Sequence, residues 1–190
     1  LWDRWDLRGG GGASGADSYR ASVKSEMNQQ LILDLGHRVA VDRADFLVSD
    51  CNAQAVEWID RWPDWPARAL VIWGPLASGK THLGHVWCAK SSAAHITAED
   101  VRAEDAADLR ARNACLFLDD ADTLAGTPED EEALLHLYNY VLETDGALLL
   151  ASQAAPAHWP VSLADLSSRM KALQGVGIAP PDDSLLAALL

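Results

Sequence analysis

The sequence lacks any long hydrophobic run, and it contains only three cysteines in 190 residues. No apolar segment approaches the roughly 18 to 20 residues that cross a bilayer, and no secretion signal opens the chain. These two absences predict a cytoplasmic protein without a membrane partner. Cys51, Cys88 and Cys115 form no CxxC pair and lie among apolar residues. Buried thiols are therefore expected, rather than disulfides or zinc ligands.

Positive charge is also scarce. Lysine and arginine number 15 against 28 aspartates and glutamates, which gives a formal net charge of -13. Because nucleic acid is a polyanion whose non-specific binding depends on lysine and arginine, direct DNA binding by the chain is not expected. An acidic protein can still carry a local basic patch, so the charge disfavours DNA binding without excluding it.

The six histidines show no metal-binding pattern. His82 and His85 are three residues apart and would share one helix face, but no further ligand accompanies them. We interpret both as structural or surface groups.

The residues that are present predict one globular domain. Hydrophobic residues make up 49% of the chain, which is enough for a real core. The expected elements are, in order, helix 50–62, strand 69–73, helix 80–90, strand 94–96, helical segment 103–112, strand 115–118, helix 129–143 and strand 147–151. Asn52 is expected to cap the first helix and Pro63 to end it. The alternation of helices with apolar strands predicts a three-layer α/β fold with a mainly parallel sheet.

A phosphate-binding motif lies between strand 69–73 and the helix that follows it. The pattern GxxxxGK[ST] is matched without a gap by Gly74-Pro75-Leu76-Ala77-Ser78-Gly79-Lys80-Thr81. Backbone N–H groups of such a loop bind phosphates, Lys80 neutralises the β- and γ-phosphates, and the Thr81 hydroxyl coordinates Mg²⁺. The alternative is a glycine-rich structural turn, which the strand and helix around the motif disfavour.

Two carboxylates follow the apolar strand 115–118. Asp119 and Asp120 would lie at its carboxyl end, beside the phosphate loop in folds of this kind. In this Walker B arrangement Asp119 would hold the Mg²⁺ shell, and Asp120 would orient or deprotonate an attacking water. The alternative is a pair of solvated loop acids.

These two motifs resemble the AAA+ domain of the DnaA initiator family. The resemblance is carried by Gly79-Lys80-Thr81-His82-Leu83 and the later acid pair, and by 46–48 and 52–55, which look like the segment bordering the adenine pocket. It extends from about residue 30 to the chain end. It implies a P-loop NTPase core that binds ADP or ATP with Mg²⁺. The implied cofactor-binding residues are Gly74, Pro75, Leu76, Ala77, Ser78, Gly79, Lys80, Thr81, His82, Asp119 and Gln153.

A short segment ahead of that core resembles a sliding-clamp peptide. Residues 30–35 read QLILDL and are similar to the QLxLxL peptide by which Hda-type regulators of DnaA dock on the DNA polymerase sliding clamp. Gln30 would hydrogen-bond at the rim of an apolar groove that takes Leu31, Leu33 and Leu35. The alternative is an amphipathic edge strand whose leucines pack inward.

Two later positions extend the resemblance. Residues 148–153 resemble the sensor 1 strand, although the DnaA family usually has an acidic residue where Gln153 falls. Residues 166–170 resemble the box VII segment, which makes Arg169 the candidate arginine finger, acting across a subunit or partner interface. The alternative for Arg169 is an ordinary surface arginine on a helix.

Other features depart from the family pattern. Ala77 occupies the position of the loop's middle glycine, where a Cβ restricts the backbone and slow turnover or altered nucleotide preference is expected. Residues 181–190 read as the start of a truncated lid helix, so the helical lid and its sensor 2 arginine are expected to be missing.

The expected organisation has four parts. Residues 1–26 form a glycine-rich flexible segment, interpreted as an extended gene prediction, a sequence scar or a disordered arm. The clamp-binding-like peptide spans 27–38, the AAA+ core spans 39–180, and the lid start spans 181–190.

Several functions are compatible with these features. The resemblance implies a regulator that binds the sliding clamp and promotes hydrolysis of DnaA-bound ATP, with ADP as its own resident nucleotide, rather than a fast ATPase. Self-assembly into a homo-oligomer is left open. The alternative is a DnaA-like initiator or helicase-loader ATPase acting on DNA. A small-molecule P-loop kinase is a third reading, for which no acceptor-binding motif is visible.

Overall fold

The computed structural model describes residues 47–180. The expected N-terminal segment 1–26, the clamp-binding residues Gln30, Leu31, Leu33 and Leu35, and the lid helix over 181–190 lie outside the described residues.

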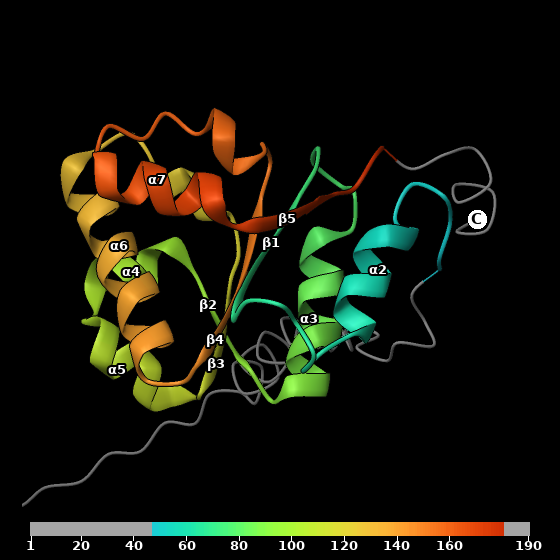
Figure 1. Cartoon of the computed structure of the whole chain (residues 1–190), viewed down its shortest axis with the longest axis horizontal. Coiled ribbons are helices and arrows are strands. Elements are labelled where there is room, and N and C mark those ends of the chain that lie inside the picture. Colours follow the sequence, from blue (N-terminus) through green and yellow to red (C-terminus); the bar gives the residue numbers. More distant parts are fainter. Residues whose placement is uncertain (1–46, 181–190) are drawn as a thin grey trace, which may run out of the picture. The chain divides into compact units, whose positions relative to one another are not determined.

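The centre of the described part is a five-stranded sheet in which neighbouring strands run parallel (Figure 1). The order across the sheet is β2-β3-β4-β1-β5. The strands are β1 (Ala69–Trp73), β2 (Ala94–Ile96), β3 (Cys115–Leu118), β4 (Ala147–Ser152) and β5 (Gln174–Gly177). The prediction of a mainly parallel sheet is confirmed. Strand β4 lies between β1 and β3, so the two predicted motifs start from strands that are not direct neighbours.

The central strands are buried on both faces. All six residues of β4 are buried, as are the first four of β1. Alternate side chains enter two separate cores, so that Leu70 and Ile72 belong to one cluster and Val71 to the other. Burial on both faces explains why these strands are continuous apolar runs instead of an apolar and polar alternation.

Helices cover both faces of the sheet, which completes the predicted three layers (Figure 1). The helices are α2 (Ala53–Asp60), α3 (Lys80–Ser91), α4 (Ala98–Ala103), α5 (Ala106–Arg112), α6 (Pro128–Glu143) and α7 (Ala164–Ala172), with short 3₁₀ turns η2 (Ala121–Leu124) and η3 (Pro156–His158). Helices α2 and α3 pack on one face, and α4 to α7 pack on the other. No helix within 47–180 has the length and apolar character needed to span a membrane.

The first helix begins where the sequence predicts, but Asn52 does not cap it in the expected way. Asn52 is the N-cap residue, yet its side chain makes no hydrogen bond to the helix. Its Oδ1 accepts from the Ser49 N–H over 3.0 Å, and its Nδ2 donates to the Leu47 carbonyl over 2.9 Å. Helix α2 also ends at Asp60, before Pro63. The side chain of Asn52 therefore fixes the incoming chain instead of the first helical turn.

The helical segment predicted over 103–112 is confirmed as α5, which begins at Ala106, but the short helix α4 before it was not predicted. Thr97 and Asp100 form a capping box that starts α4 at Ala98. Glu104 and Asp105 are extended, which separates α4 from α5. Because the whole segment is polar, its pattern indicated neither helix α4 nor the break between α4 and α5.

Strand β5 was not predicted. Its sequence, Gln174 to Gly177, contains two glycines and little apolar character, so its pattern does not indicate a strand. The glycines are explained by the neighbouring strand: a Cβ at Gly177 would lie 2.8 Å from the ring of Trp73. The strand forms because it pairs with β1, a contact that sequence pattern alone does not reveal.

The cysteines and one histidine pair have structural positions. Within residues 47–180 the three cysteines are free and half-buried, and burial raises the pKa of the Cys88 thiol to about 11. The rings of His85 and His95 meet edge to face with centroids 4.9 Å apart. These observations agree with the predicted buried thiols and with a structural role for His85.

Candidate phosphate-binding site

The loop after β1 is held at both ends by backbone contacts. The Gly74 N–H donates to the Ser152 carbonyl at the end of β4 over 3.1 Å. A Cβ on Gly74 would lie 2.4 Å from the Ile178 carbonyl oxygen, so only glycine fits there. Gly79 has φ +90° and immediately precedes α3. The two motif glycines therefore occupy positions that a side chain would clash with or strain.

Ala77 lies in the same loop with a left-handed backbone conformation, at φ +60°. For a residue with a Cβ this conformation costs about 1 to 2 kcal/mol. The sequence predicted that a Cβ at this position would restrict the backbone. In the structure Ala77 adopts a left-handed conformation that glycine would adopt without strain.

Lys80 points back into the loop. Its side chain is buried, and its Nζ donates to the carbonyl oxygens of Gly74, over 2.9 Å, and Pro75, over 2.7 Å. Among the described residues no carboxylate forms an ion pair with Lys80. The loop therefore holds a buried cation whose hydrogen-bond partners are carbonyl oxygens and not a carboxylate, an arrangement suited to an anion.

The remaining side chains of the motif and its first helical turn differ in how exposed they are. The Ser78 hydroxyl is buried and has no hydrogen-bond partner within residues 47–180. A buried polar atom without a partner is costly, which makes Ser78 a candidate ligand contact. Leu76, by contrast, is 73% exposed at the tip of the loop, and Pro75 is also exposed. His82 lies half-buried in the first turn of α3.

The two predicted motifs meet through one side-chain contact. The Thr81 hydroxyl at the start of α3 donates to Asp119 Oδ2, after β3, over 2.7 Å. The other carboxylate oxygen, Asp119 Oδ1, accepts from the Asp120 N–H over 3.0 Å. A hydroxyl and a carboxylate are oxygen ligands of the kind that Mg²⁺ prefers.

Residues 47–180 contain no group of three or more His, Cys, Asp or Glu that would hold a metal by itself.

Asp120 is exposed and also has a left-handed backbone, at φ +47°. Partial removal from water raises the pKa of its carboxyl, the carboxylates of Asp119 and Asp122 raise it further, and Lys80 lowers it. A cavity of about 490 Å³ lies beside this residue, with His95, Thr97 and Arg102 also on its walls. Asp120 is thus an accessible carboxylate with increased proton affinity, as a general base requires.

Asp122 was not singled out from the sequence, yet it joins the two strand ends. Its Oδ2 accepts from the Gln153 N–H over 3.0 Å, while its Oδ1 is buried without a partner. The side chain of Gln153 itself is exposed just after β4. In the sequence, the only signal for this contact with Gln153 was a third acid, Asp122, two residues after Asp120.

Arg169 lies away from these groups. It is half-exposed on α7, where its guanidinium contacts Asp165 over 3.4 Å and lies 6.0 Å from the ring centre of Tyr138 on α6. Helices α6 and α7 cover the sheet face opposite α3. The structure therefore brings the phosphate loop and Asp119 together, but it does not bring Arg169 to them.

Glu131 is a second residue that the sequence did not reveal. Its carboxylate is fully buried and accepts hydrogen bonds from the N–H groups of Gly126, Ser162 and Leu163 and from the Ser162 hydroxyl. Burial alone would raise the pKa of Glu131, but these bonds outweigh it, and the pKa lies below its ordinary value. Glu131 thereby anchors the chain at the start of α7.

The sheet order, the loop after β1 and the acids after β3 define a P-loop α/β core of the AAA+ type. No known family model matches the sequence. The fold is similar to that of three solved replication-initiation proteins.

A DNA replication initiation factor is 21% identical, with a TM-score of 0.67, over 78% of this chain and 52% of its own. Domain III of DnaA from Thermotoga maritima is 19% identical, with a TM-score of 0.65, over 78% of this chain and 71% of its own. Replication initiator DnaA bound to AMPPCP and single-stranded DNA is 20% identical, with a TM-score of 0.61, over 77% and 51%. The chain thus spans about half the length of the initiation factor and of this DnaA.

Proposed function

We propose that this chain is a DnaA-related regulator that binds ADP or ATP with Mg²⁺, docks on the DNA polymerase sliding clamp, and promotes hydrolysis of ATP bound to DnaA. The hydrogen bond between Thr81 and Asp119 supports the nucleotide site most directly. It places a hydroxyl and a carboxylate from two distant motifs together, next to the buried cation of Lys80. A solved DnaA with the same fold binds AMPPCP, which supports an adenine nucleotide as the ligand.

The residues present fit such a ligand. The backbone of 74–79 and the side chains of Ser78 and Lys80 would hold the phosphates, and Thr81 and Asp119 would hold the metal. Mg²⁺ would neutralise phosphate charge there. Ser78 offers a hydroxyl that has no internal partner, and Lys80 has only carbonyl partners to give up. His82 and Gln153 are proposed to border the same site.

The position of Arg169 supports a role on a partner instead of on the chain's own nucleotide. Its contacts with Asp165 and Tyr138 are on the opposite face of the sheet from α3. The pair with Asp165 is half-exposed and long, so this ion pair holds the guanidinium only weakly, although its Nε is buried. An arginine that stabilises the developing charge on a transferred phosphoryl group can act across an interface in this way.

A DnaA-like initiator or helicase-loader ATPase remains the second candidate, and Asp120 favours it. This carboxylate is exposed beside the proposed magnesium ligand and has a raised pKa, as hydrolysis by the chain itself would need. The net charge of -13 counts against direct action on DNA. Substantial ATP turnover by the purified chain, lost in Asp120→Asn, would favour this candidate.

The regulator is tested by hydrolysis of DnaA-bound ATP in the presence of DNA-loaded clamp. We expect Arg169→Ala to remove most of the stimulation. Arg61→Ala is the matched control, because Arg61 also forms an i,i+4 ion pair and also lies near an aromatic ring. Stimulation that persists in Arg169→Ala would contradict the role of Arg169.

Clamp docking is tested separately, by binding of the chain to DNA-loaded clamp. The double substitution Gln30→Ala/Leu33→Ala is expected to abolish this binding while nucleotide binding is unchanged. If the unsubstituted chain does not bind the clamp, residues 30–35 are better explained as a structural strand, and the ATPase candidate is preferred.

A further inference from the structure

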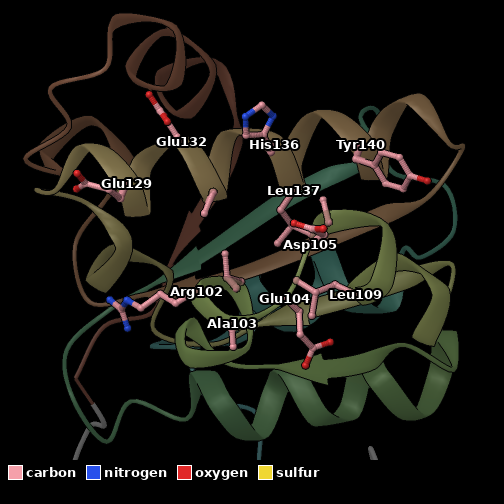
Figure 2. Close-up of a pocket in the computed structure, with 13 residues that line it drawn as sticks. Arg102, Ala103, Glu104, Asp105, Leu109, Glu129, Glu132, His136, Leu137 and Tyr140 are labelled. Atoms are coloured by element: carbon pink, nitrogen blue, oxygen red, sulfur yellow. The ribbon is translucent and has the colours of Figure 1, made fainter.

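A groove separates α6 from α4 and α5 on the sheet face opposite α3 (Figure 2). Its volume is about 560 Å³, which is comparable to the ~300 to 1,000 Å³ of ordinary ligand sites. Among the described residues its walls include none from the phosphate loop. We call it the α6 groove. It is thus a different place from the proposed nucleotide site.

The accessible apolar surface of the α6 groove is small. Val101, Leu109 and Leu137 line the groove but are almost completely buried in the core, so they leave little surface for a ligand. Ala106 and Ala133 are half-buried small residues beside them. Small side chains between two helices leave room for an apolar side chain from outside, whose burial would be favourable.

One wall is a continuous stripe along α6. The lining residues of this helix are spaced at 3, 4, 7, 8 and 11 positions from the first, which is the spacing of one helix face. They are Glu129, Glu132, Ala133, His136, Leu137 and Tyr140. At 1.5 Å per residue the stripe is about 16 Å long. Figure 2 shows Glu129, Glu132, His136 and Tyr140 along this wall, opposite Arg102 to Asp105.

The rim of the groove carries uncompensated negative charge. Glu129, Glu132 and Asp105 make no side-chain hydrogen bond or ion pair with any residue in the described part of the chain. The arginine that lines the groove, Arg102, is already engaged, because Asp130 accepts from its Nε and one terminal nitrogen over 3.0 and 3.1 Å. An incoming cation would therefore meet three free carboxylates.

We propose that the α6 groove is a docking surface for a cationic, amphipathic segment of a partner protein. Apolar side chains of that segment pack on the half-buried Ala106 and Ala133, and its lysines or arginines face Glu129, Glu132 and Asp105. Tyr140, which is 38% exposed, adds an aromatic surface at one end. Charge complementarity decides the occupant: nucleic acid and a second copy of this acidic chain would both be repelled.

The test uses the full chain and a defined probe, a fluorescent 12-residue peptide of alternating leucine and lysine pairs. Binding is measured by fluorescence anisotropy, and its position by amide chemical-shift changes. Glu129→Gln/Glu132→Gln is expected to weaken binding roughly threefold to thirtyfold, since each of the two surface ion pairs contributes a few tenths to 1 kcal/mol. The matched control is Asp50→Asn/Asp64→Asn, which removes the same charge from exposed residues flanking α2.

Each outcome decides the proposal. Selective weakening in the Glu129/Glu132 double variant, with shifts concentrated on α4, α5 and α6, supports the groove as a docking surface. Equal weakening in both double variants, or shifts spread over the acidic surface, would show general charge attraction and overturn it. Absence of peptide binding to the unsubstituted chain at low salt would also overturn it.

Discussion

Thr81 Oγ1 and Asp119 Oδ2 lie 2.7 Å apart, although 38 residues separate them in the sequence. Thr81 begins α3 and Asp119 follows β3, so this contact depends on the strand order and on the packing of α3 against the sheet. It makes the two motifs one site.

Lys80→Ala is expected to lower nucleotide affinity at least tenfold, because Lys80 is the buried cation of the loop. Binding of a fluorescent ATP analogue measures the effect. Lys90→Ala is the control from the same helix, since Lys90 is exposed and contacts the carbonyls of Ile59 and Asp60. Equal affinity in Lys80→Ala and the unsubstituted chain would remove the loop from the proposed site.

Thr81→Val is expected to abolish most of the magnesium dependence of nucleotide binding. Valine has the shape of threonine without the hydroxyl that now donates to Asp119. The measurement is nucleotide affinity with Mg²⁺ and with a chelator. The variant in Mg²⁺ should resemble the unsubstituted chain in chelator, and a full magnesium response in the variant would contradict the assignment.

Ala77→Gly is expected to stabilise the chain by about 0.5 to 1 kcal/mol. Relief of a left-handed alanine is worth about 1 to 2 kcal/mol, and the greater freedom of glycine in the unfolded chain offsets part of it. Urea unfolding measures the change. Ala155→Gly is the control, because Ala155 has φ -57° and should only be destabilised. If Ala77→Gly lowered the unfolding free energy as much as Ala155→Gly, the claim that the Ala77 backbone is strained would be contradicted.

Glu131→Gln is expected to destabilise the fold by about 2 kcal/mol at neutral pH, because a buried charged acceptor of several hydrogen bonds is lost. Glu132→Gln, on the next and exposed position, should change stability little.

The same residue predicts a pH dependence. The folded pKa of Glu131 lies below its ordinary value of 4.5, so its stabilisation is present above the unfolded pKa and is lost as the pH falls toward the folded pKa. Unfolding free energies measured from pH 6 downward should therefore fall less steeply in Glu131→Gln than in the unsubstituted chain. If the two curves of unfolding free energy against pH were parallel, the proposed contribution of Glu131 to the pH dependence would be contradicted.

Elements with a strong local pattern were predicted well, and elements that depend on distant partners were not. Strands β1 and β4 are apolar runs whose burial follows from their composition. Strand β5 has no such pattern, because its place is decided by pairing with β1 and by the ring of Trp73 above its glycines. Helix α5 lies within the predicted segment 103–112, but the short helix α4 before it was missed, because its polar residues show no clear apolar periodicity.

The sequence by itself determined the three-layer α/β class, the GxxxxGK[ST] loop after β1 and the acid pair after β3, because each depends on neighbouring residues and their periodicity. Only the tertiary structure decided that Thr81 meets Asp119, that Asp122 joins the Gln153 backbone, and that Glu131 anchors the start of α7. These contacts link residues about 30 to 40 positions apart. Their formation depends on strand order and helix packing, which lie beyond any local window of the sequence.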